Sequence, residues 1–152
     1  MSDISELIER VRAATGWDQE LDADIAEAVG IRVNRENFTR YTQEWSPFIY
    51  DWLGCNKHPL PNFTGSISDA VALVGRVLPG WWVTCGMCDL SGHASIGPDY
   101  NGPHRERLLR EWPQEQFHSG FDEDLEPGGN WSATCRAIIV CLLMAKQAET
   151  QP

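Results

Sequence analysis

"LPGWWVTCGMCDLSGH", residues 78–93, decides the fold of this chain. Two tryptophans stand side by side, a Cys-x-x-Cys follows, and a histidine comes five residues after the second cysteine. WWVTCGMC is mostly apolar, DLSG is a polar turn, and HASIG can supply a second strand, so the stretch predicts a β-hairpin. We therefore expect a central strand and its turn here.

The Cys-x-x-Cys spacing of Cys85 and Cys88 also occurs in zinc knuckles, where a tight turn aims two sulfurs at one ion. Cys55 and His58 would complete a Cys3His set. On a regular strand, however, positions i and i+3 point to opposite faces. A thioredoxin-like redox pair would open a helix, which CGMCDLSGH does not resemble. We therefore predict no metal and no cofactor, and interpret both cysteines as buried small apolar residues, with zinc as the open alternative.

Four helices flank this hairpin in the predicted order of elements. Apolar residues at i, i+3, i+4 and i+7 predict a first helix from Asp3 to Gly16. The second is predicted from Asp18, its N-cap, to Gly30, and the third from Ser66 to Leu78, before Pro79-Gly80. The last, in SATCRAIIVCLLMAKQAE, is apolar on nearly every side, which is typical of a helix covered on more than one side. Asn130 or Ser132 would cap it.

The remaining segments are less regular. IRVNRENFTRYTQEW, residues 31–45, predicts a hairpin, and SPFIYDWLG, residues 46–54, predicts one or two helical turns. Residues 98–130 are polar and contain four prolines, with HRERLLREW as a short helix candidate. FDEDLE, residues 121–126, is interpreted as a solvated acidic run. We expect one domain over residues 1–152, with a polar variable insertion at about 98–130.

Composition limits the partners. The chain has 152 residues, seven tryptophans and a formal net charge of −10, so it should be repelled by nucleic acid and by anionic membranes. No apolar run is long enough to span a bilayer, and the N-terminal stretch is not a signal peptide. We therefore expect no direct nucleic-acid binding, no membrane, a cytoplasmic location and reduced cysteines. The sequence leaves the oligomeric state open, a homo-oligomer included.

The predicted fold is α+β, an α/β sandwich with a small, mostly antiparallel sheet and helices packed on both faces. Three stretches carry a resemblance: ELIERVRAATGWDQELDADIAEAVGI, LPNFTGSISDAVALVGRVLPGWWV and SATCRAIIVCLLMA. They resemble a family of small phage and prophage proteins described as a phage α-β-α sandwich domain. The resemblance covers roughly residues 4–98 and 130–147. It implies this fold and a viral or prophage origin in a bacterial host cell, and it brings no activity or catalytic residue.

No catalytic set is recognisable in the sequence. Gly-x-Ser-x-Gly, Gly-x-Gly-x-x-Gly and a phosphate-loop lysine are absent, and none of the four histidines has a signature neighbour. We therefore expect a chain that is not an enzyme.

Aromatic and arginine residues in the loops are the best binding candidates. Rings stack on bases, guanidinium groups hold phosphates, and the same residue types dominate protein interfaces. We predict a non-catalytic binding protein that sequesters a nucleotide-like signal to counter host defence. The alternative is an acidic protein-interaction module or nucleic-acid mimic that binds a basic host protein. The predicted ligand-binding residues are Trp45, Tyr50, Trp52, Tyr100, Arg105, Arg107 and Trp112.

Overall fold

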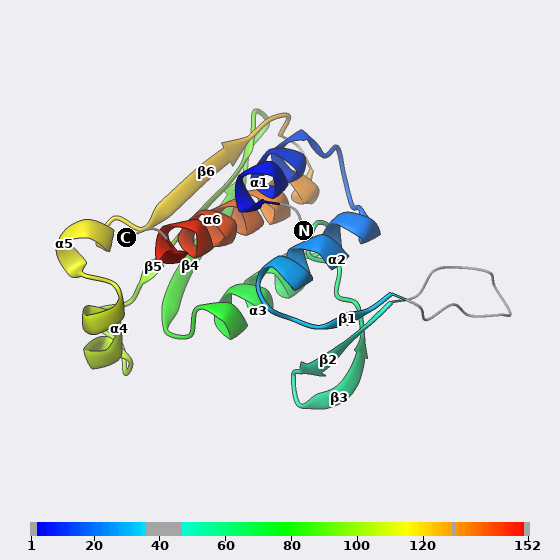
Figure 1. Cartoon of the computed structure of the whole chain (residues 1–152). Coiled ribbons are helices and arrows are strands. Elements are labelled where there is room, and N and C mark those ends of the chain that lie inside the picture. Colours follow the sequence, from blue (N-terminus) through cyan, green and yellow to red (C-terminus); the bar gives the residue numbers. More distant parts are fainter. Residues whose placement is uncertain (1–2, 36–46, 129, 151–152) are drawn as a thin grey trace, which may run out of the picture.

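The computed structural model describes residues 3–35, 47–128 and 130–150. Their elements follow one another along the chain in the order shown in Figure 1. They are α1 (Ile4–Ala13), α2 (Gln19–Ala28), β1 (Val33–Asn34), β2 (Phe48–Trp52), β3 (Cys55–Pro59), α3 (Ile67–Val77), β4 (Trp81–Met87), β5 (Gly92–Pro98), α4 (Arg105–Glu111), α5 (Gln114–Phe117), β6 (Phe121–Leu125) and α6 (Trp131–Thr150).

The strands form two antiparallel sheets with the orders β1-β2-β3 and β4-β5-β6. The prediction of a small α+β fold with mostly antiparallel strands is confirmed. The hairpin predicted from WWVTCGMC and HASIG, residues 81–97, is confirmed as well, because β4 pairs with β5 along their full length, from Trp81 opposite Pro98 to Met87 opposite Gly92.

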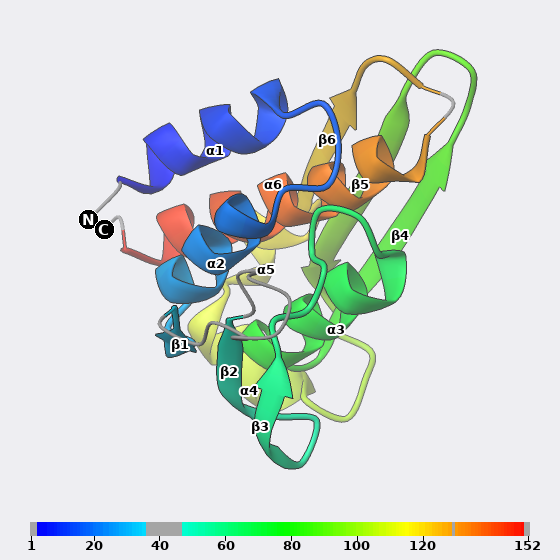
Figure 2. The same cartoon turned by 90° about the vertical axis from the view of Figure 1, so that its right-hand side faces the viewer.

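Helix α6 lies between two layers of the molecule. It packs on β4, β5 and β6 on one side and on α1 and α3 on the other (Figures 1 and 2). Its residues from Ala133 to Leu143 are all buried, as the apolar run predicted. Helices thus cover the inner face of the β4–β6 sheet, through Ala94 and Ile96, whereas the outer face carries exposed Thr84 and His93.

Local capping explains where the helices begin. The Asp18 carboxylate accepts the Leu21 N–H at 3.1 Å, and the Ser66 hydroxyl accepts the Asp69 N–H at 3.3 Å. The Asn130 side-chain oxygen accepts the Ala133 N–H at 2.9 Å. Each bond satisfies an amide that a helix start leaves unpaired. Asp3 stands at the N-cap of α1 without such a bond.

The helical turns predicted for residues 46–54 are wrong. Residues 48–52 form β2, and β3 returns antiparallel to it, with Ile49 opposite His58. The turn between them places Leu53 and Gly54 at positive φ, which a helix does not allow. β1 also pairs with β2, and the FTRYT strand predicted at residues 38–42 lies outside the described residues.

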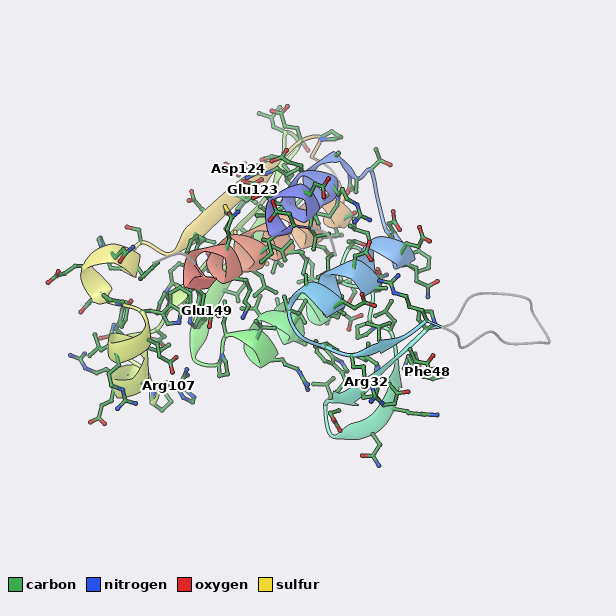
Figure 3. The ribbon with its side chains drawn as sticks, viewed as in Figure 1. Arg32, Phe48, Arg107, Glu123, Asp124 and Glu149 are labelled. Atoms are coloured by element: carbon green, nitrogen blue, oxygen red, sulfur yellow. The ribbon has the colours of Figure 1, made fainter. Side chains whose placement is uncertain are left out.

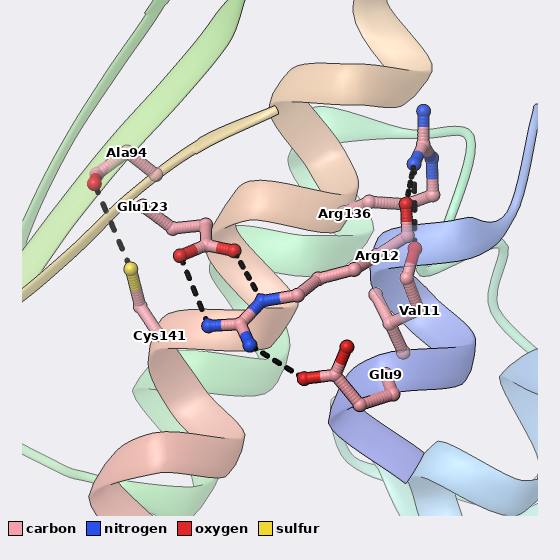
Figure 4. A network of polar contacts seen from close by, with 7 residues as sticks. All are labelled: Glu9, Val11, Arg12, Ala94, Glu123, Arg136 and Cys141. Carbon is pink, nitrogen blue, oxygen red and sulfur yellow. Dashed lines mark hydrogen bonds and ion pairs between the residues drawn. The ribbon is translucent and has the colours of Figure 1, made fainter. Parts of the chain in front are cut away.

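The acidic run FDEDLE is a strand rather than a solvated segment. β6 pairs with β5, and its alternation places Asp122 and Asp124 in solvent while Leu125 is buried. Glu123 points inward and accepts two hydrogen bonds from the Arg12 guanidinium, the shorter at 2.6 Å (Figure 4). This ion pair neutralises the one carboxylate that faces the helices, so the acidic segment can join the sheet.

The interpretation of Cys85 and Cys88 as buried residues is wrong, because both thiols are exposed. Cys85 lies on the edge strand β4, and Cys88 lies in the turn, where backbone N–H groups of Leu90 and Ser91 lower the pKa of its thiol. Buried cysteines occur instead on α6, at positions 135 and 141. Burial raises the pKa of Cys135 to about 11 and that of Cys141 to about 12.

A buried polar network joins α2, the segment before α3, and α6. The Thr64 N–H and the Trp17 indole N–H each donate to the Asp22 carboxylate at 2.9 Å. The Ser132 hydroxyl donates to the Thr64 carbonyl at 2.8 Å and accepts from the Arg136 guanidinium at 3.3 Å. Asp22, Thr64 and Arg136 are at most 1% exposed. We call these five residues the Asp22 network.

Arg136 also reaches the end of α1. Its guanidinium donates to the Val11 carbonyl at 3.3 Å and to the Arg12 carbonyl at 3.4 Å, across the interface between the first and last helices (Figure 4). No carboxylate among the described residues pairs with it. A buried cation thus satisfies carbonyl groups that a helix C-terminus leaves unpaired.

Candidate functional site

The predicted ligand-binding residues fall into two separate groups. Tyr50 and Trp52 lie on β2, whereas the other four described members surround α4. Figure 3 shows this separation through Arg32, near β2, and Arg107, on α4, at opposite sides of the view. Trp45 lies outside the described residues.

In the first group, Trp52 is a core residue. It is 1% exposed and meets the Phe63 ring edge-on, with ring centroids 5.8 Å apart. Tyr50 lies at the surface, where the Arg32 guanidinium sits 4.0 Å from its ring centroid. A hollow opens here, and it is lined by Arg32, Val33, Asn34, Arg35 and Tyr50. Trp52 is therefore placed to pack, and Tyr50 to line a surface hollow.

The Arg35 side chain of this hollow already forms ion pairs with acidic neighbours. It donates to Glu27 at 2.7 Å and to Asp24 at 2.6 Å. Both carboxylates compete with any anionic ligand for that guanidinium. The hollow beside Tyr50 is accordingly a weaker anion site than its two arginines suggest.

In the second group, aromatic rings form a base for α4. Trp112 meets Trp81 and Phe117 edge-on, each with ring centroids 4.9 Å apart. Phe121 stacks on Trp81 at 6.1 Å and joins the ring set to β6. Such pairs contribute about 0.5–1.5 kcal/mol each beyond their buried area. Trp112 is 5% exposed, so its ring holds α4 in place and presents no open face.

Hydrogen bonds fix the position of α4 further. The buried Tyr100 hydroxyl donates to the Trp112 carbonyl at 2.6 Å, and Arg105 donates to the Tyr100 carbonyl at 3.0 Å. Arg107 donates to the Pro79 carbonyl at 2.6 Å, which ties the helix to the turn before β4. Tyr100 and Trp112 are therefore positioning residues for the two arginines.

Tyr100→Phe should destabilise the protein by about 1 kcal/mol, because the substitution removes the donor to the buried Trp112 carbonyl. Urea unfolding followed by tryptophan fluorescence measures this change. Tyr50→Phe is the matched control, since its hydroxyl lies at the surface, where it accepts a long 3.3 Å bond from Asn34. Equal, negligible changes in both variants would show that the Tyr100 bond contributes nothing.

The hollow beside α4 is the best candidate for a functional site, and we call it the α4 hollow. Gly80, at φ +88°, lies against His104, so no larger residue fits beneath that ring. Arg107 pairs with Glu111 at 3.0 Å, whereas Arg105 and Arg110 have no carboxylate partner among the described residues. The lining residues are Pro103, His104, Arg105, Glu106, Arg107 and Arg110.

The site differs from the predicted one in composition. Arg105 and Arg107 are present as predicted, but no tryptophan or tyrosine of the described residues lines the hollow. Arg110 comes one helical turn after Arg107, a spacing that places both on the same side of α4. Arg110 was not among the predicted ligand-binding residues, and its i, i+3 spacing from Arg107 in HRERLLRE is the sequence signal that could have added it.

The alternative zinc set is dispersed between the two sheets. Cys55 and His58 lie on β3, whereas Cys85 lies on β4 and Cys88 in the following turn. In the described ranges, no three histidine, cysteine, aspartate or glutamate side chains gather where they could hold a metal ion. None of the helices in this part of the chain is long and apolar enough to cross a membrane.

The chain matches no protein-family model, no curated protein and no solved structure.

Proposed function

We propose that this chain is a non-catalytic binding protein that takes a phosphate-bearing small ligand in the α4 hollow. In its sharper form, the ligand is a nucleotide-like signal, and the protein sequesters it in the cytoplasm of a bacterial host to counter a defence system. The resemblance to phage α-β-α sandwich proteins motivates that biological setting. The phosphate specificity is supported by the residues of the hollow.

The observation that supports this proposal best is a pair of arginines, Arg105 and Arg110, that have no carboxylate partner among the described residues of a chain with net charge −10. A guanidinium presents a planar fork of N–H donors that matches two phosphate oxygens. Arg105 and Arg110 are exposed, so they bind without first breaking an ion pair. Three arginines and one carboxylate, that of Glu106, line the hollow, so it favours an anion although acidic residues elsewhere repel one.

Phosphate is the recognised group in this proposal. The aromatic rings near the site are occupied with packing, so a base would extend toward solvent and gain little stacking energy. His104, exposed beside the arginines, offers a base an accessible ring within the described lining of the hollow. Affinity should therefore follow the number of phosphates more closely than the identity of the base.

Isothermal titration against inorganic pyrophosphate, ATP, cyclic AMP and a cyclic dinucleotide tests the proposal. Arg110→Ala should weaken binding by about tenfold or more, because a charge-assisted hydrogen bond is worth roughly 1.5–3 kcal/mol. Arg32→Ala, in the hollow beside Tyr50, is the matched control and should leave the affinity unchanged. Absence of heat with every probe rejects the proposal, and loss of binding only in Arg32→Ala moves the site to β2.

A second candidate function is supported by the outer face of the β4–β6 sheet. This face carries Asp122 and Asp124 on β6, exposed His93 on β5, and Trp82, whose ring lies over Gly97. An acidic strand beside an accessible indole suits a basic protein segment. Pull-down from host lysate at low and high salt, with Asp122→Asn/Asp124→Asn as comparison, separates this candidate from the first.

A further inference from the structure

The β4–β6 sheet has two edges of opposite character. One edge is β6, where Asp122, Glu123 and Asp124 follow one another. The other is β4, and residues 77–88 contain no charged side chain. Natural edge strands are usually protected from pairing by charge, proline or a bulge. Charge protects β6, and none of these devices protects β4.

The backbone of β4 has free hydrogen-bonding groups on its outer side. The Cys88 N–H donates to the Ser91 carbonyl at one end of the hairpin, and the Asp99 N–H donates to the Gly80 carbonyl at the other. Hydrogen-bonded pairs alternate along an antiparallel ladder, so the even-numbered residues of β4 bond to β5. Val83, Cys85 and Met87 therefore direct their N–H and C=O groups away from the sheet.

These outward groups have no hydrogen-bond partner within residues 3–35, 47–128 and 130–150. In Figure 2, β4 is the outermost strand, and no described element lies beyond it along most of its length. Cys85, in the middle of the strand, is exposed. A seven-residue, uncharged and accessible strand edge is a template for pairing with another strand.

We infer that β4 is a dimerisation edge, where it pairs antiparallel with β4 of a second copy. A two-fold axis through Thr84 aligns all seven residues, with Val83 opposite Cys85 of the other copy and Trp81 opposite its Met87. The result is a continuous six-stranded sheet, ordered β6-β5-β4-β4-β5-β6. This contact is isologous and closes on itself, so it ends at a dimer.

Charge selects a second copy over the other occupants of this edge. Two chains of net charge −10 repel each other, and an uncharged strand lets them meet with their acidic β6 edges at the far ends of the joint sheet. A basic partner would gain no ion pair from β4. Pairing of β4 with β6 of another copy would build an open filament, and the carboxylates of β6 oppose it.

Sedimentation velocity in the presence of a thiol reductant tests the inference, since the reductant excludes disulfide-linked dimers. Wild-type protein should sediment with a mass twice the 17.1 kDa of one chain. Cys85→Lys places charge on the edge at an exposed position and should raise the dissociation constant at least tenfold. His93→Lys, exposed on β5 of the same sheet, is the matched control and should remain dimeric.

Hydrogen exchange provides a second readout that needs no substitution. The amides of Val83, Cys85 and Met87 should exchange slowly in concentrated protein and quickly in dilute protein, whereas those of Trp82 and Thr84 should be protected at both concentrations. A monomer at all concentrations overturns the inference. So does a dimer that Cys85→Lys leaves intact, or one whose outward β4 amides exchange at a rate independent of concentration.

Discussion

Replacing Asp22 by asparagine should remove much of the pH dependence of unfolding between about pH 4 and pH 7. Burial raises the pKa of the Asp22 carboxyl from 3.8 to about 7, against the hydrogen bonds from Thr64 and Trp17, which lower it. The folded protein thus holds a proton that the unfolded chain releases. The stability this proton confers is fully present below pH 3.8 and is lost as the pH rises toward 7.

The expected size of this effect is large for one group. At about 1.36 kcal/mol per pH unit, the interval corresponds to roughly 4 kcal/mol, as an upper value. The asparagine amide keeps an acceptor for the Thr64 N–H and does not titrate. Urea unfolding of both proteins at pH 4, 5, 6, 7 and 8 should show wild type favoured at the acidic end and the difference shrinking or reversing by pH 8.

The difference between the two proteins isolates Asp22 from the other carboxyl groups. Asp24 matters here because bonds from Arg10 and Arg35 lower its pKa, and it therefore adds a stability change of opposite sign to both proteins. Asp24→Asn provides the control for that contribution. The opposite result would be a free energy of unfolding that rises with pH in wild type relative to Asp22→Asn. It would mean that the hydrogen bonds from Thr64 and Trp17 outweigh burial and keep Asp22 ionised.

Arg136→Ala should cost roughly 3 kcal/mol or more of folding free energy. The side chain is 1% exposed at the centre of the helix interface, so truncation leaves a cavity that its neighbours cannot fill. Arg136→Met should recover more than half of this loss. The hydrogen bonds of the wild-type Arg136 guanidinium to Val11, Arg12 and Ser132 are long, at 3.3–3.4 Å, and burial of the charge lowers the pKa of Arg136. We therefore expect packing to contribute more to stability than these polar contacts.

Chemical denaturation of the two Arg136 variants at one pH decides between packing and polar contacts. If methionine is as damaging as alanine, the capping of the α1 carbonyls is the main contribution. Lys146→Met serves as a control, since Lys146 lies on the same helix and forms a surface ion pair with Glu149. Surface pairs of this kind contribute about 1 kcal/mol or less.

The elements that the sequence predicts best are those whose signals are local. The caps at Asp18, Ser66 and Asn130 and the hairpin at residues 81–98 each depend on neighbours within a few positions. β6 could not be recognised as a strand because three consecutive acidic residues, Asp122 to Asp124, give no alternation of polar and apolar residues. The compatibility of Glu123 with the inner face depends on Arg12, which lies 111 positions away in the sequence.

The candidate site was predicted in part for a similar reason. Arginines on a short polar helix remain accessible in most folds, and Arg105 and Arg107 do line the α4 hollow. Aromatic residues are ambiguous, because a tryptophan that stacks on a ligand and one that packs under a helix have the same neighbours in sequence. Trp52 and Trp112 proved to be packing residues only when their tertiary partners, Phe63 and Trp81, were known.

The central position of α6 sets the order in which this protein can mature on the ribosome. α6 is the last described element to be synthesised, yet both the β4–β6 sheet and the N-terminal helices pack against it. Until residue 150 has left the exit tunnel, the apolar faces of those earlier elements remain exposed, because α6 is not yet available to pack against them. Chaperone capture of the nascent chain should therefore persist until translation has passed that point.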